Sequence, residues 1–328
     1  MNKQTCIKVM LFSVSLWTMA FPARAEASAP EQSALFRVTL LGTGVPQPQI
    51  RRSSYSTLVE AGSQKLLFDF GRNAATRLWQ MKIPLSQIDS YFLTHFHSDH
   101  TVGLADLWLT GWLPSPYGGR TNAMALYGPE GIKAMADGLQ QTYAKDIKMR
   151  HEDEGTALDG VKIDVTEIKS GVVYDKDGVK VIAFDNDHGV HIKPSFGYKI
   201  EYKGHSVVLS GDTRYTPEVV KQAKGADLLV HCVAMVSDEF MQANPVYKKI
   251  ADHLASPEDA ARIFDEAKPK LAVFSHIGLN GNIDEHDLVR EVKNRYSGPF
   301  VVGEDLMHFE IPTAAKDNGI VIWQSGNN

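Results

Sequence analysis

THFHSDH, residues 94–100, has the pattern H-x-H-x-D-H and directly follows Ile88–Leu93, an apolar run typical of a buried strand. Imidazole and carboxylate groups are common protein ligands for zinc, and four of them occur here within six residues. Successive side chains of a strand point to opposite faces, so a strand cannot direct all four to one point, whereas a loop leaving a strand can. The stretch therefore predicts part of a metal site at a strand end, in preference to a His-rich surface loop.

Three further candidate ligands occur shortly after apolar segments that we predict as strands. They are His188 after Val179–Phe184, Asp212 after Ser206–Ser210, and His276 after Leu271–Phe274. Open α/β sheets place their functional groups beyond the carboxyl ends of strands. Each residue alone would be an ordinary polar side chain, but together with the His-rich loop they indicate one shared site.

The order of predicted elements indicates an α/β protein. Two strand-rich halves, each flanked by helices, favour two packed sheets with helices outside them, an αββα four-layer sandwich. The predicted helices are Ala74–Met81 with Asn73 as its cap, Val102–Trp112, Gly131–Met149, Thr216–Ala223, Pro257–Ala267 and Asp284–Tyr296. Residues 151–155 are expected to form an acidic loop, and Asp227–Cys232 a strand.

The first 25 residues have the features of a secretory signal peptide. Lys3 and Lys8 give a basic start, Val9–Phe21 is apolar, and Ala23-Arg24-Ala25 is a small-residue cleavage site. The apolar run is too short to span a membrane. We therefore expect a signal peptide over residues 1–25, a disordered leader over 26–34, a single domain over 35–328, and a periplasmic or secreted product.

Removal of the signal peptide would change the charge and the cysteine count. It leaves 31 basic and 39 acidic residues, a formal charge of −8, which disfavours a nucleic-acid partner because phosphate contacts need a basic face. Cys232 is then the only cysteine, so no intrachain disulfide can form in an oxidising compartment. Because it follows an apolar segment, Cys232 is expected to be a small buried residue and not a nucleophile.

Five motifs occur along the chain in a recognisable order. They are Gly42-Thr43-Gly44, the H-x-H-x-D-H stretch, His188 followed by Gly197-Tyr198, Ser210-Gly211-Asp212-Thr213, and Phe274-Ser275-His276. With these motifs, residues 36–310 resemble the metallo-β-lactamase-fold hydrolases. Within that superfamily the chain is most similar to the branch that contains the tRNA 3′-processing endonucleases (tRNase Z) and the zinc arylsulfatases. The run Leu107–Trp112 looks more like the arylsulfatases.

The resemblance implies an αββα sandwich with two zinc ions and assigns a role to each candidate residue. His95, His97 and His188 would bind the first ion, Asp99, His100 and His276 the second, and Asp212 would bridge them. Asp99 would also orient the attacking hydroxide, and His253 would protonate the leaving oxygen. Two metal ions can stabilise both the attacking and the leaving oxygen of a displacement. Lys193 and Arg214, near ligand motifs, could neutralise a sulfate or phosphate oxygen, or be solvated.

Departures from the family patterns restrict the reaction. Asp212 stands where many true lactamases have cysteine, which disfavours a β-lactamase. His231-Cys232 replaces the His-Glu of the tRNA-processing branch, whose long basic arm is also missing. We therefore expect an exported dinuclear zinc hydrolase that cleaves a sulfate or phosphate ester of a small molecule, with arylsulfatase-like activity first. A phosphodiesterase, including a tRNase Z-like ribonuclease, is the alternative, and a non-catalytic zinc-binding protein is the alternative of another class. The expected partner is the ester substrate alone, with neither nucleic acid nor membrane, and a homodimer is left open.

The cleavage site can be tested directly. Expression of the full chain in a bacterium that processes signal peptides should yield a mature protein beginning at Glu26, because signal peptidase cleaves after small-residue motifs such as Ala23-Arg24-Ala25. Intact-mass measurement and N-terminal sequencing of the purified product would show this. Retention of Met1 in an export-competent host would contradict the assignment, and Ala25→Phe, which should block cleavage, serves as the matched control.

Overall fold

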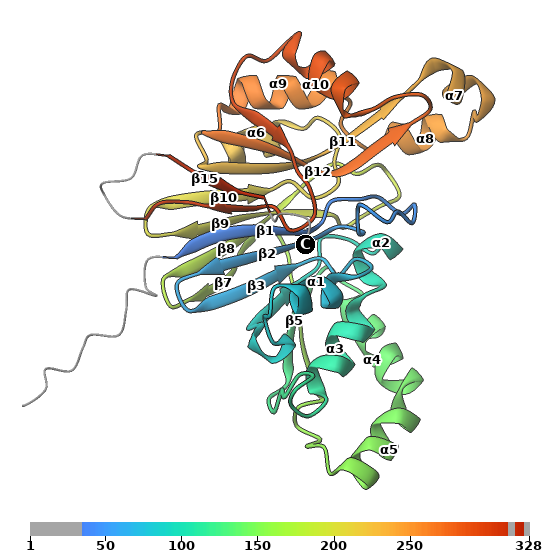
Figure 1. Cartoon of the computed structure of the whole chain (residues 1–328), viewed down its shortest axis with the longest axis vertical. Helices are drawn as coiled ribbons and strands as arrows, with labels where there is room; N and C mark the ends of the chain where they lie inside the picture. The colour runs from blue at the N-terminus through green and yellow to red at the C-terminus, as the bar shows by residue number, and fades with distance from the viewer. Residues whose placement is uncertain (1–34, 314–318, 325–328) are drawn as a thin grey trace, which may run out of the picture. The chain divides into compact units, whose positions relative to one another are not determined.

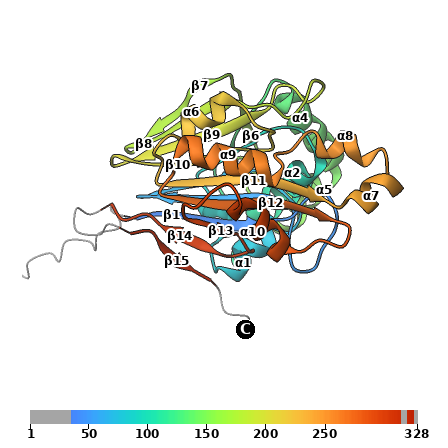
Figure 2. The same ribbon diagram turned by 90° about the horizontal axis from the view of Figure 1, so that it is seen from above.

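Two mixed sheets pack face to face in the computed structural model, which describes residues 35–313 and 319–324 (Figures 1 and 2). The expected signal peptide and leader lie outside the described residues. The first sheet has the order β15-β14-β1-β2-β3-β4-β5-β6, and the second has the order β13-β12-β11-β10-β9-β8-β7. Among the residues described, no helix is both long and apolar enough to cross a bilayer.

The strands of the first sheet are β1 (Phe36–Gly42), β2 (Ser56–Ala61), β3 (Gln64–Phe68), β4 (Ser90–Phe92), β5 (Met124–Gly128), β6 (Ile163–Glu167), β14 (His308–Glu310) and β15 (Val321–Trp323). Those of the second are β7 (Gly171–Lys176), β8 (Val179–Asp185), β9 (Phe196–Tyr202), β10 (His205–Leu209), β11 (Leu228–Val236), β12 (Leu271–Asn280) and β13 (Phe300–Val302). Strands β3 to β6 and β10 to β13 pair in parallel, so their carboxyl ends lie at one edge of each sheet.

Eleven helices, among the described residues, cover the outer faces of the sheets or follow the strand ends. They are α1 (Ala74–Gln80), the 3₁₀ helix η2 (Leu85–Gln87), α2 (Ser98–Thr101), α3 (Leu104–Trp112), α4 (Ile132–Thr142), α5 (Ala144–Glu154), α6 (Pro217–Ala223), α7 (Asp238–Ala243), α8 (Tyr247–Ala251), α9 (Pro257–Ala267) and α10 (Glu285–Lys293). Helices α1 and α3 lie on the first sheet, and α6, α9 and α10 lie on the second.

Three apolar clusters hold these layers together. The cluster between the sheets contains alternate residues of facing strands, and within it the rings of Phe68 and Phe92 stack with centroids 4.9 Å apart. Each outer cluster joins a sheet to its helices, with Trp108 of α3 on one side and Phe264 of α9 on the other. The side chains of Phe68, Phe92, Phe264 and Trp108 are fully buried. Each therefore contributes the free energy of removing its apolar surface from water. The arrangement is the predicted four-layer sandwich.

The helix predicted over Gly131–Met149 is wrong, because two helices, α4 and α5, occupy this region and meet at Tyr143. The Tyr143 ring packs edge-on against Trp108 with centroids 6.3 Å apart, and its backbone leaves the helical conformation (φ −98°, ψ 9°). Tertiary packing thus overrides continuous helical propensity.

The acidic loop predicted over 151–155 is wrong, because α5 continues to Glu154. Arg150 forms ion pairs one turn away in each direction, with Asp146 at 3.2 Å and Glu154 at 3.0 Å, which support a solvent-exposed helix. Gly155 (φ 69°) ends it. At α1, Asn73 is at the N-cap position as predicted, but its amide donates to Ser53 instead of capping the helix.

The turn Gly42–Gly44 brings the first sheet against the second. A Cβ atom on Gly42 would lie 1.9 Å from the carbonyl oxygen of Ser54, so only glycine fits this approach. The carbonyl oxygen of Thr43 accepts a hydrogen bond from the amide of Ile277 on β12 at 2.9 Å. The turn therefore holds β12 at the point where a candidate ligand, His276, is located.

The carboxylate of Asp305 fixes this turn through hydrogen bonds. Its carboxylate accepts hydrogen bonds from the amide and hydroxyl of Thr43, both at 2.9 Å, from the amide of Ser53 at 2.7 Å, and from the guanidinium of Arg77 at 2.8 Å. The Asp305 side chain is only 5 % exposed, so water could not easily take the place of its carboxylate as the acceptor for the four donors. One carboxylate therefore connects the C-terminal segment to β1, the β1–β2 loop and α1.

We predict that Asp305→Ala lowers the free energy of unfolding by about 3–5 kcal/mol, because it removes the acceptor of three buried donors of Thr43 and Ser53 and the carboxylate partner of the partly buried Arg77 guanidinium. Urea denaturation of the purified protein measures this change. Asp137→Ala is the matched control, since Asp137 pairs with Lys133 at 2.8 Å on the exposed face of α4, and we expect a loss of about 0.5 kcal/mol or less. Equal losses in the two variants would contradict the proposed role of Asp305.

Candidate metal centre

All seven residues that the sequence suggested as metal ligands meet at the carboxyl ends of the strands. They are His95 and His97 in the segment after β4, Asp99 and His100 in α2, His188 after β8, Asp212 after β10, and His276 within β12. Their ligand atoms form three overlapping groups, each with all atoms within 4.8 Å of one another: His95, His97 and His188; His95, His100 and Asp212; and Asp99, His100 and His276. Four different segments thus form one cluster.

The H-x-H-x-D-H stretch is part loop and part helix. His97 is the N-cap of α2, and Asp99 and His100 lie within that short helix, where both are buried. Asp99 and His100, in the helix, belong to the group with His276. His95 and His97, in the preceding extended segment, belong to the group with His188. This division within six residues requires the change from extended to helical backbone.

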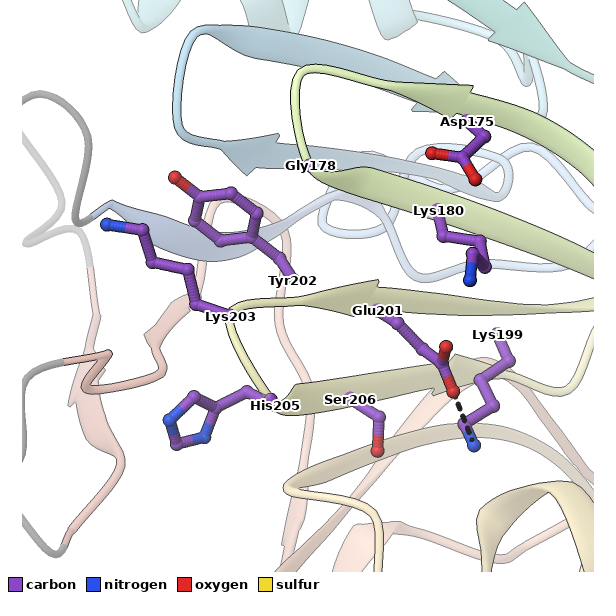
Figure 3. A pocket seen from close by; sticks show the side chains of 10 residues that line it. Asp175, Gly178, Lys180, Lys199, Glu201, Tyr202, Lys203, His205 and Ser206 are labelled. Atoms are coloured by element: carbon purple, nitrogen blue, oxygen red, sulfur yellow. Dashed lines mark ion pairs between the residues drawn. The ribbon is translucent and has the colours of Figure 1, made fainter.

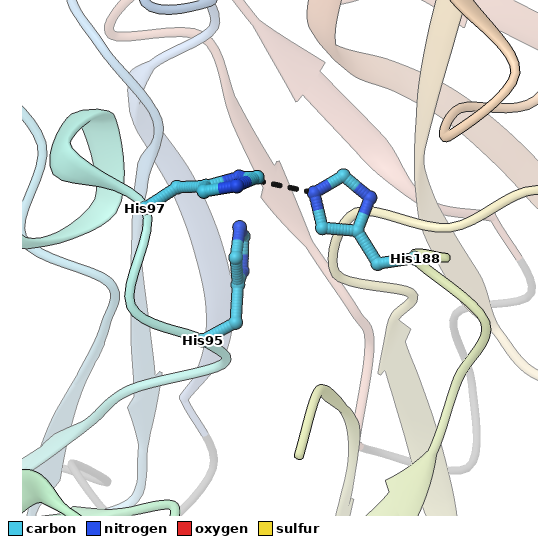
Figure 4. Close-up of side chains that lie close together, drawn as sticks. All are labelled: His95, His97 and His188. Carbon is cyan, nitrogen blue, oxygen red and sulfur yellow. Dashed lines mark hydrogen bonds between the residues drawn. The ribbon is translucent and has the colours of Figure 1, made fainter. Parts of the chain in front are cut away.

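Figure 4 shows the first group, in which the rings of His95, His97 and His188 converge. The Nε2 atom of His188 lies 3.1 Å from the Nδ1 atom of His97, and the ring centroids of His95 lie 4.7 Å from those of both other rings. Three imidazoles directed at one point form a ligand set that suits zinc.

Asp212 lies between this group and the second one. Its Oδ2 atom is 3.1 Å from the Nε2 atom of His276, 3.4 Å from that of His100 and 3.7 Å from that of His188. Asp99 completes the second group, 3.1 Å from His276 and 3.6 Å from His100. Asp212 therefore contacts ligands of both groups.

His276 enters the site through a bulge in β12, and the strand predicted to end at Phe274 continues to Asn280. His231 pairs with Phe274 and Val233 with Ile277, so β12 has one more residue here than β11. His276 adopts φ 50°, a left-handed conformation that is rare outside glycine. The bulge rotates the His276 side chain into the site from the middle of a strand.

Hydrogen bonds at the outer side of the rings leave the inner atoms free. The Nδ1 atoms of His100, His188 and His95 contact the Asp69 carboxylate at 2.8 Å, the His253 carbonyl at 2.9 Å and the Thr94 hydroxyl at 2.9 Å. Three buried atoms of the cluster have no hydrogen-bond partner: His95 Nε2, His100 Nε2 and Asp212 Oδ1. Buried polar atoms without partners are rare in proteins, and metal ligation would satisfy them. The residues therefore fit a metal.

The electrostatics also favour a bound cation. Burial lowers the pKa of His95 well below its usual value and that of His188 to about 4, so both imidazoles are neutral, as metal binding requires. Burial alone would raise the pKa of Asp212, but His276 and His100 outweigh it and hold that pKa well below the usual range. Burial likewise opposes charge on His100, yet Asp212 and Asp69 raise its pKa well above normal. The buried carboxylates thus need positive charge beside them.

Asp69 and Tyr55 belong to the site although the sequence analysis did not include them. Asp69 is fully buried and accepts hydrogen bonds from the amide and hydroxyl of Thr94, both at 2.8 Å, in addition to its contact with His100. The Tyr55 ring lies against His100 and His276, with centroids 5.4 and 5.9 Å away. A carboxylate directly after the apolar strand β3 was a signal that could have identified Asp69.

His253 lies just after α8 at the edge of the cluster. Its ring centroid is 5.8 Å from that of His188, and among the described residues the ring has no hydrogen-bond partner. A Cβ atom on Gly189 would lie 2.9 Å from the His253 ring, and Gly189 has φ 110°, so glycine there makes room for the ring. His253 and five of the seven candidate ligands (His97, Asp99, His188, Asp212 and His276) line one cleft of about 470 Å³.

The other residues considered from the sequence lie outside this cleft. Cys232 is buried, its thiol bonded to the Thr213 backbone, and burial raises its pKa to about 12. Arg214 pairs with Asp187 at 2.8 Å, so a neighbouring carboxylate already neutralises it. Leu107 and Trp112 are core residues of α3, so the Leu107–Trp112 run has a packing role and does not mark a substrate.

A second hollow, of about 500 Å³, lies on the outer face of β8, β9 and β10 (Figure 3). Its charged groups have both signs, and Lys199 pairs with Glu201 at 2.9 Å. None of the candidate metal groups found among the described residues lies there. The strand-end cleft is therefore the candidate active site.

Comparison with known proteins agrees with the fold and the site. Ribonuclease Z of Mycolicibacterium gilvum is 32 % identical over 282 residues, which cover 84 % of this chain and 96 % of that protein. The structure of the metallo-β-lactamase-fold protein YhfI of Bacillus subtilis has a TM-score of 0.65 at 18 % identity, covering 84 % of this chain and 99 % of that one. The short form of human tRNase Z has a TM-score of 0.62 at 23 % identity, with 84 % and 99 % covered.

Fold, ligand cluster and relatives together define a metal-dependent hydrolase of the metallo-β-lactamase fold, related to ribonuclease Z. The chain belongs to the family described as anti-Pycsar protein Apyc1, whose family model matches residues 36–257. The family resemblance and the αββα fold class inferred from the sequence are confirmed.

We predict that the zinc-loaded protein binds close to two zinc ions and that Asp212→Ala binds both more weakly, since Asp212 contacts ligands of both groups. Metal analysis after dialysis, with a zinc-competition titration, measures this. Asp227→Ala is the matched control, because Asp227 is also a buried carboxylate paired with a histidine (His205, 3.2 Å) but lies outside the three groups. One ion in the unchanged protein, or full affinity in Asp212→Ala, would refute a bridging role.

Proposed function

We propose that this protein is a dinuclear zinc phosphodiesterase that hydrolyses a small diester. The observation that supports it is the junction of two ligand groups at Asp212, beside a cleft that also contains the unpartnered His253 ring. His95, His97 and His188 would hold one ion, Asp99, His100 and His276 the other, and Asp212 both. The ions would supply positive charge for the attacking and leaving oxygens and lower the pKa of the attacking water.

The relatives favour a phosphodiester over the sulfate ester that the sequence alone ranked first. Ribonuclease Z, 32 % identical, is by its name an enzyme that acts on RNA, a phosphodiester. The run Leu107–Trp112, which suggested an arylsulfatase, is explained by core packing. Arylsulfatase-like activity therefore becomes the second candidate, and a phosphodiester the first.

The cleft itself favours a small substrate over tRNA. Among the described residues, its lining includes no lysine or arginine. Binding of a polynucleotide requires several such basic side chains to contact its phosphates. The cleft volume of about 470 Å³ is in the range of small-ligand sites. A non-catalytic zinc-binding protein would need neither this volume beside its ligands nor an unpartnered histidine, so we rank that alternative last.

Two side chains act on protons in this proposal. Asp99 bonds to His276 at 3.1 Å and lines the cleft, where its carboxylate can orient the attacking water. His253 also lines the cleft, and its ring is free to donate a proton to the leaving oxygen. A positioned general acid contributes about 10²–10⁴-fold when the leaving group is basic, and much less when the leaving group is acidic.

We expect the zinc-loaded mature chain to hydrolyse bis(4-nitrophenyl) phosphate faster than 4-nitrophenyl sulfate, and precursor tRNA poorly. His253→Ala should reduce kcat by about 10²-fold or more on a diester with an alkoxide leaving group, but only a few-fold with 4-nitrophenolate. Steady-state assays compare the two leaving groups. His286→Ala is the control, since His286 lies in the first turn of α10, outside the cleft.

Faster cleavage of the sulfate would restore the arylsulfatase assignment. Equal losses on both leaving groups in His253→Ala would remove His253 as the proton donor, while leaving the phosphodiesterase assignment in place.

A further inference from the structure

Two of the loops that carry candidate ligands lie at the same edge of the second sheet, although their strands are not neighbours. His188 follows β8 and Asp212 follows β10, and β9 lies between these strands and runs antiparallel to both. The hydrogen bonds of the sheet join each strand to β9 and do not join the two loops directly. The Nε2 atom of His188 nevertheless lies 3.7 Å from the Oδ2 atom of Asp212, where the first ligand group meets the bridging carboxylate.

Backbone groups make a first connection between the two loops. The amide of Arg214 donates to the carbonyl oxygen of Asp187 at 3.0 Å, and the amide of Asp187 donates to the hydroxyl of Thr213 at 3.1 Å. Asp187 directly precedes the ligand His188, and Thr213 directly follows the ligand Asp212. The loops are therefore joined at the residues beside their ligands.

The side chains of Asp187 and Arg214 add a two-point ion pair to this connection. The Nε atom of Arg214 lies 2.8 Å from Oδ2 of Asp187, and its Nη2 atom lies 3.1 Å from Oδ1. The same Oδ1 atom accepts a hydrogen bond from the amide of Gly189 at 3.2 Å, so one carboxylate contacts both the residue after His188 and the other loop. A guanidinium paired at two points with a carboxylate fixes orientation as well as distance. The Arg214 guanidinium also holds the pKa of Asp187 below its usual value, so the carboxylate is ionised at neutral pH.

The exposure of this pair limits its contribution to the stability of the whole fold. The side chains of Arg214 and Asp187 are 41 % and 38 % exposed, and exposed ion pairs contribute little to the free energy of unfolding because water and salt screen them. A similar pair joins Arg150 and Asp146 within α5, where the Nε atom lies 3.2 Å from both carboxylate oxygens and the side chains are 33 % and 34 % exposed. The two pairs differ in what they connect, since only the first one joins two ligand loops.

We infer that Arg214 and Asp187 are positioning residues whose ion pair sets the separation of His188 and Asp212, and so holds the first ligand group against the bridging carboxylate. Neither positioning residue lines the cleft formed by the described residues, so the pair acts through the ligands and not on the substrate. The ligand group that contains Asp99 has no residue from these two loops. The inference rests on the dinuclear zinc site of the proposed function.

The test measures zinc affinity and requires no turnover. Arg214→Ala should raise the Kd of one zinc ion about 10-fold, as expected for a residue that orients metal ligands, and the Kd of the other less than about 3-fold. Asp187→Ala should weaken the same ion at least as much, because it also removes the acceptor of the Gly189 amide. Adding Arg214→Ala to Asp187→Ala should have no further effect, because the two residues act as one pair. Competition between the metal-free protein and a chelator of known zinc affinity measures both constants.

Matched variants separate positioning from a general loss of stability. Arg150→Ala removes the comparable exposed pair on α5 and should leave both zinc affinities unchanged. Urea denaturation of the metal-free proteins should give Arg214→Ala and Arg150→Ala similar midpoints, because both lose one exposed ion pair. Arg214→Lys keeps the positive charge without the two-point contact, so it should restore only part of the lost affinity.

Cobalt(II) in place of zinc gives an independent measurement, because its visible absorption depends on the geometry of its ligands. At saturating cobalt, the spectrum of Arg214→Ala should differ from that of the unchanged protein, and the spectrum of Arg150→Ala should not. An unchanged zinc affinity or an unchanged cobalt spectrum in Arg214→Ala would overturn the inference. An equal loss of affinity for both ions, together with a lower urea midpoint than that of Arg150→Ala, would also overturn it. If the unchanged protein binds two zinc ions but hydrolyses no ester, the proposed function fails, and these titrations still decide the positioning role.

Discussion

The burial of three carboxylates at one point is the constraint on which this site depends. Asp69, Asp99 and Asp212 are each at most 2 % exposed and all contact His100. Ionised carboxylates in such surroundings are very costly unless positive charge lies beside them. Without metal, that charge can come only from a proton on a buried imidazole such as His100, whose pKa the carboxylates raise. A divalent cation would satisfy the same need and also the unpartnered inner atoms of His95 and His100.

The two sheets hold these side chains close together despite the free energy that burial of ionised carboxylates costs. Parallel strands bring their ends to one edge, and the interleaved clusters between and outside the sheets fix those ends. Where a strand end alone would not direct a side chain into the site, a local change of backbone conformation does so. The bulge at His276 turns a mid-strand residue inward, and the Gly42–Gly44 turn with Asp305 holds the strand at that bulge.

The cleft has two parts that differ in the residues that line them. One part is polar and contains the candidate ligands, while the other is largely apolar, with Gln47, Tyr247 and Asn280 as its hydrogen-bonding side chains among the described residues. A basic surface that would hold a long polyanion is missing from the lining in the described residues. The relationship to ribonuclease Z shows a metal-dependent hydrolase of this fold, and the lining of the cleft supports our proposal of a smaller ester.

The sequence by itself determined the fold class and the seven candidate ligands, because metal ligands are chemically distinctive and each follows a recognisable strand. It marked Asp69 only as a carboxylate directly after an apolar strand, and could not show its role, which depends on a contact with His100, 31 residues away. Nor could it show the break at Tyr143 or the bulge at His276, since both result from packing against distant elements: Trp108 for the first and β11 for the second. Only the tertiary structure brought Tyr247 to Asn280, because a hydrogen bond between residues 33 positions apart leaves no local signal in the sequence.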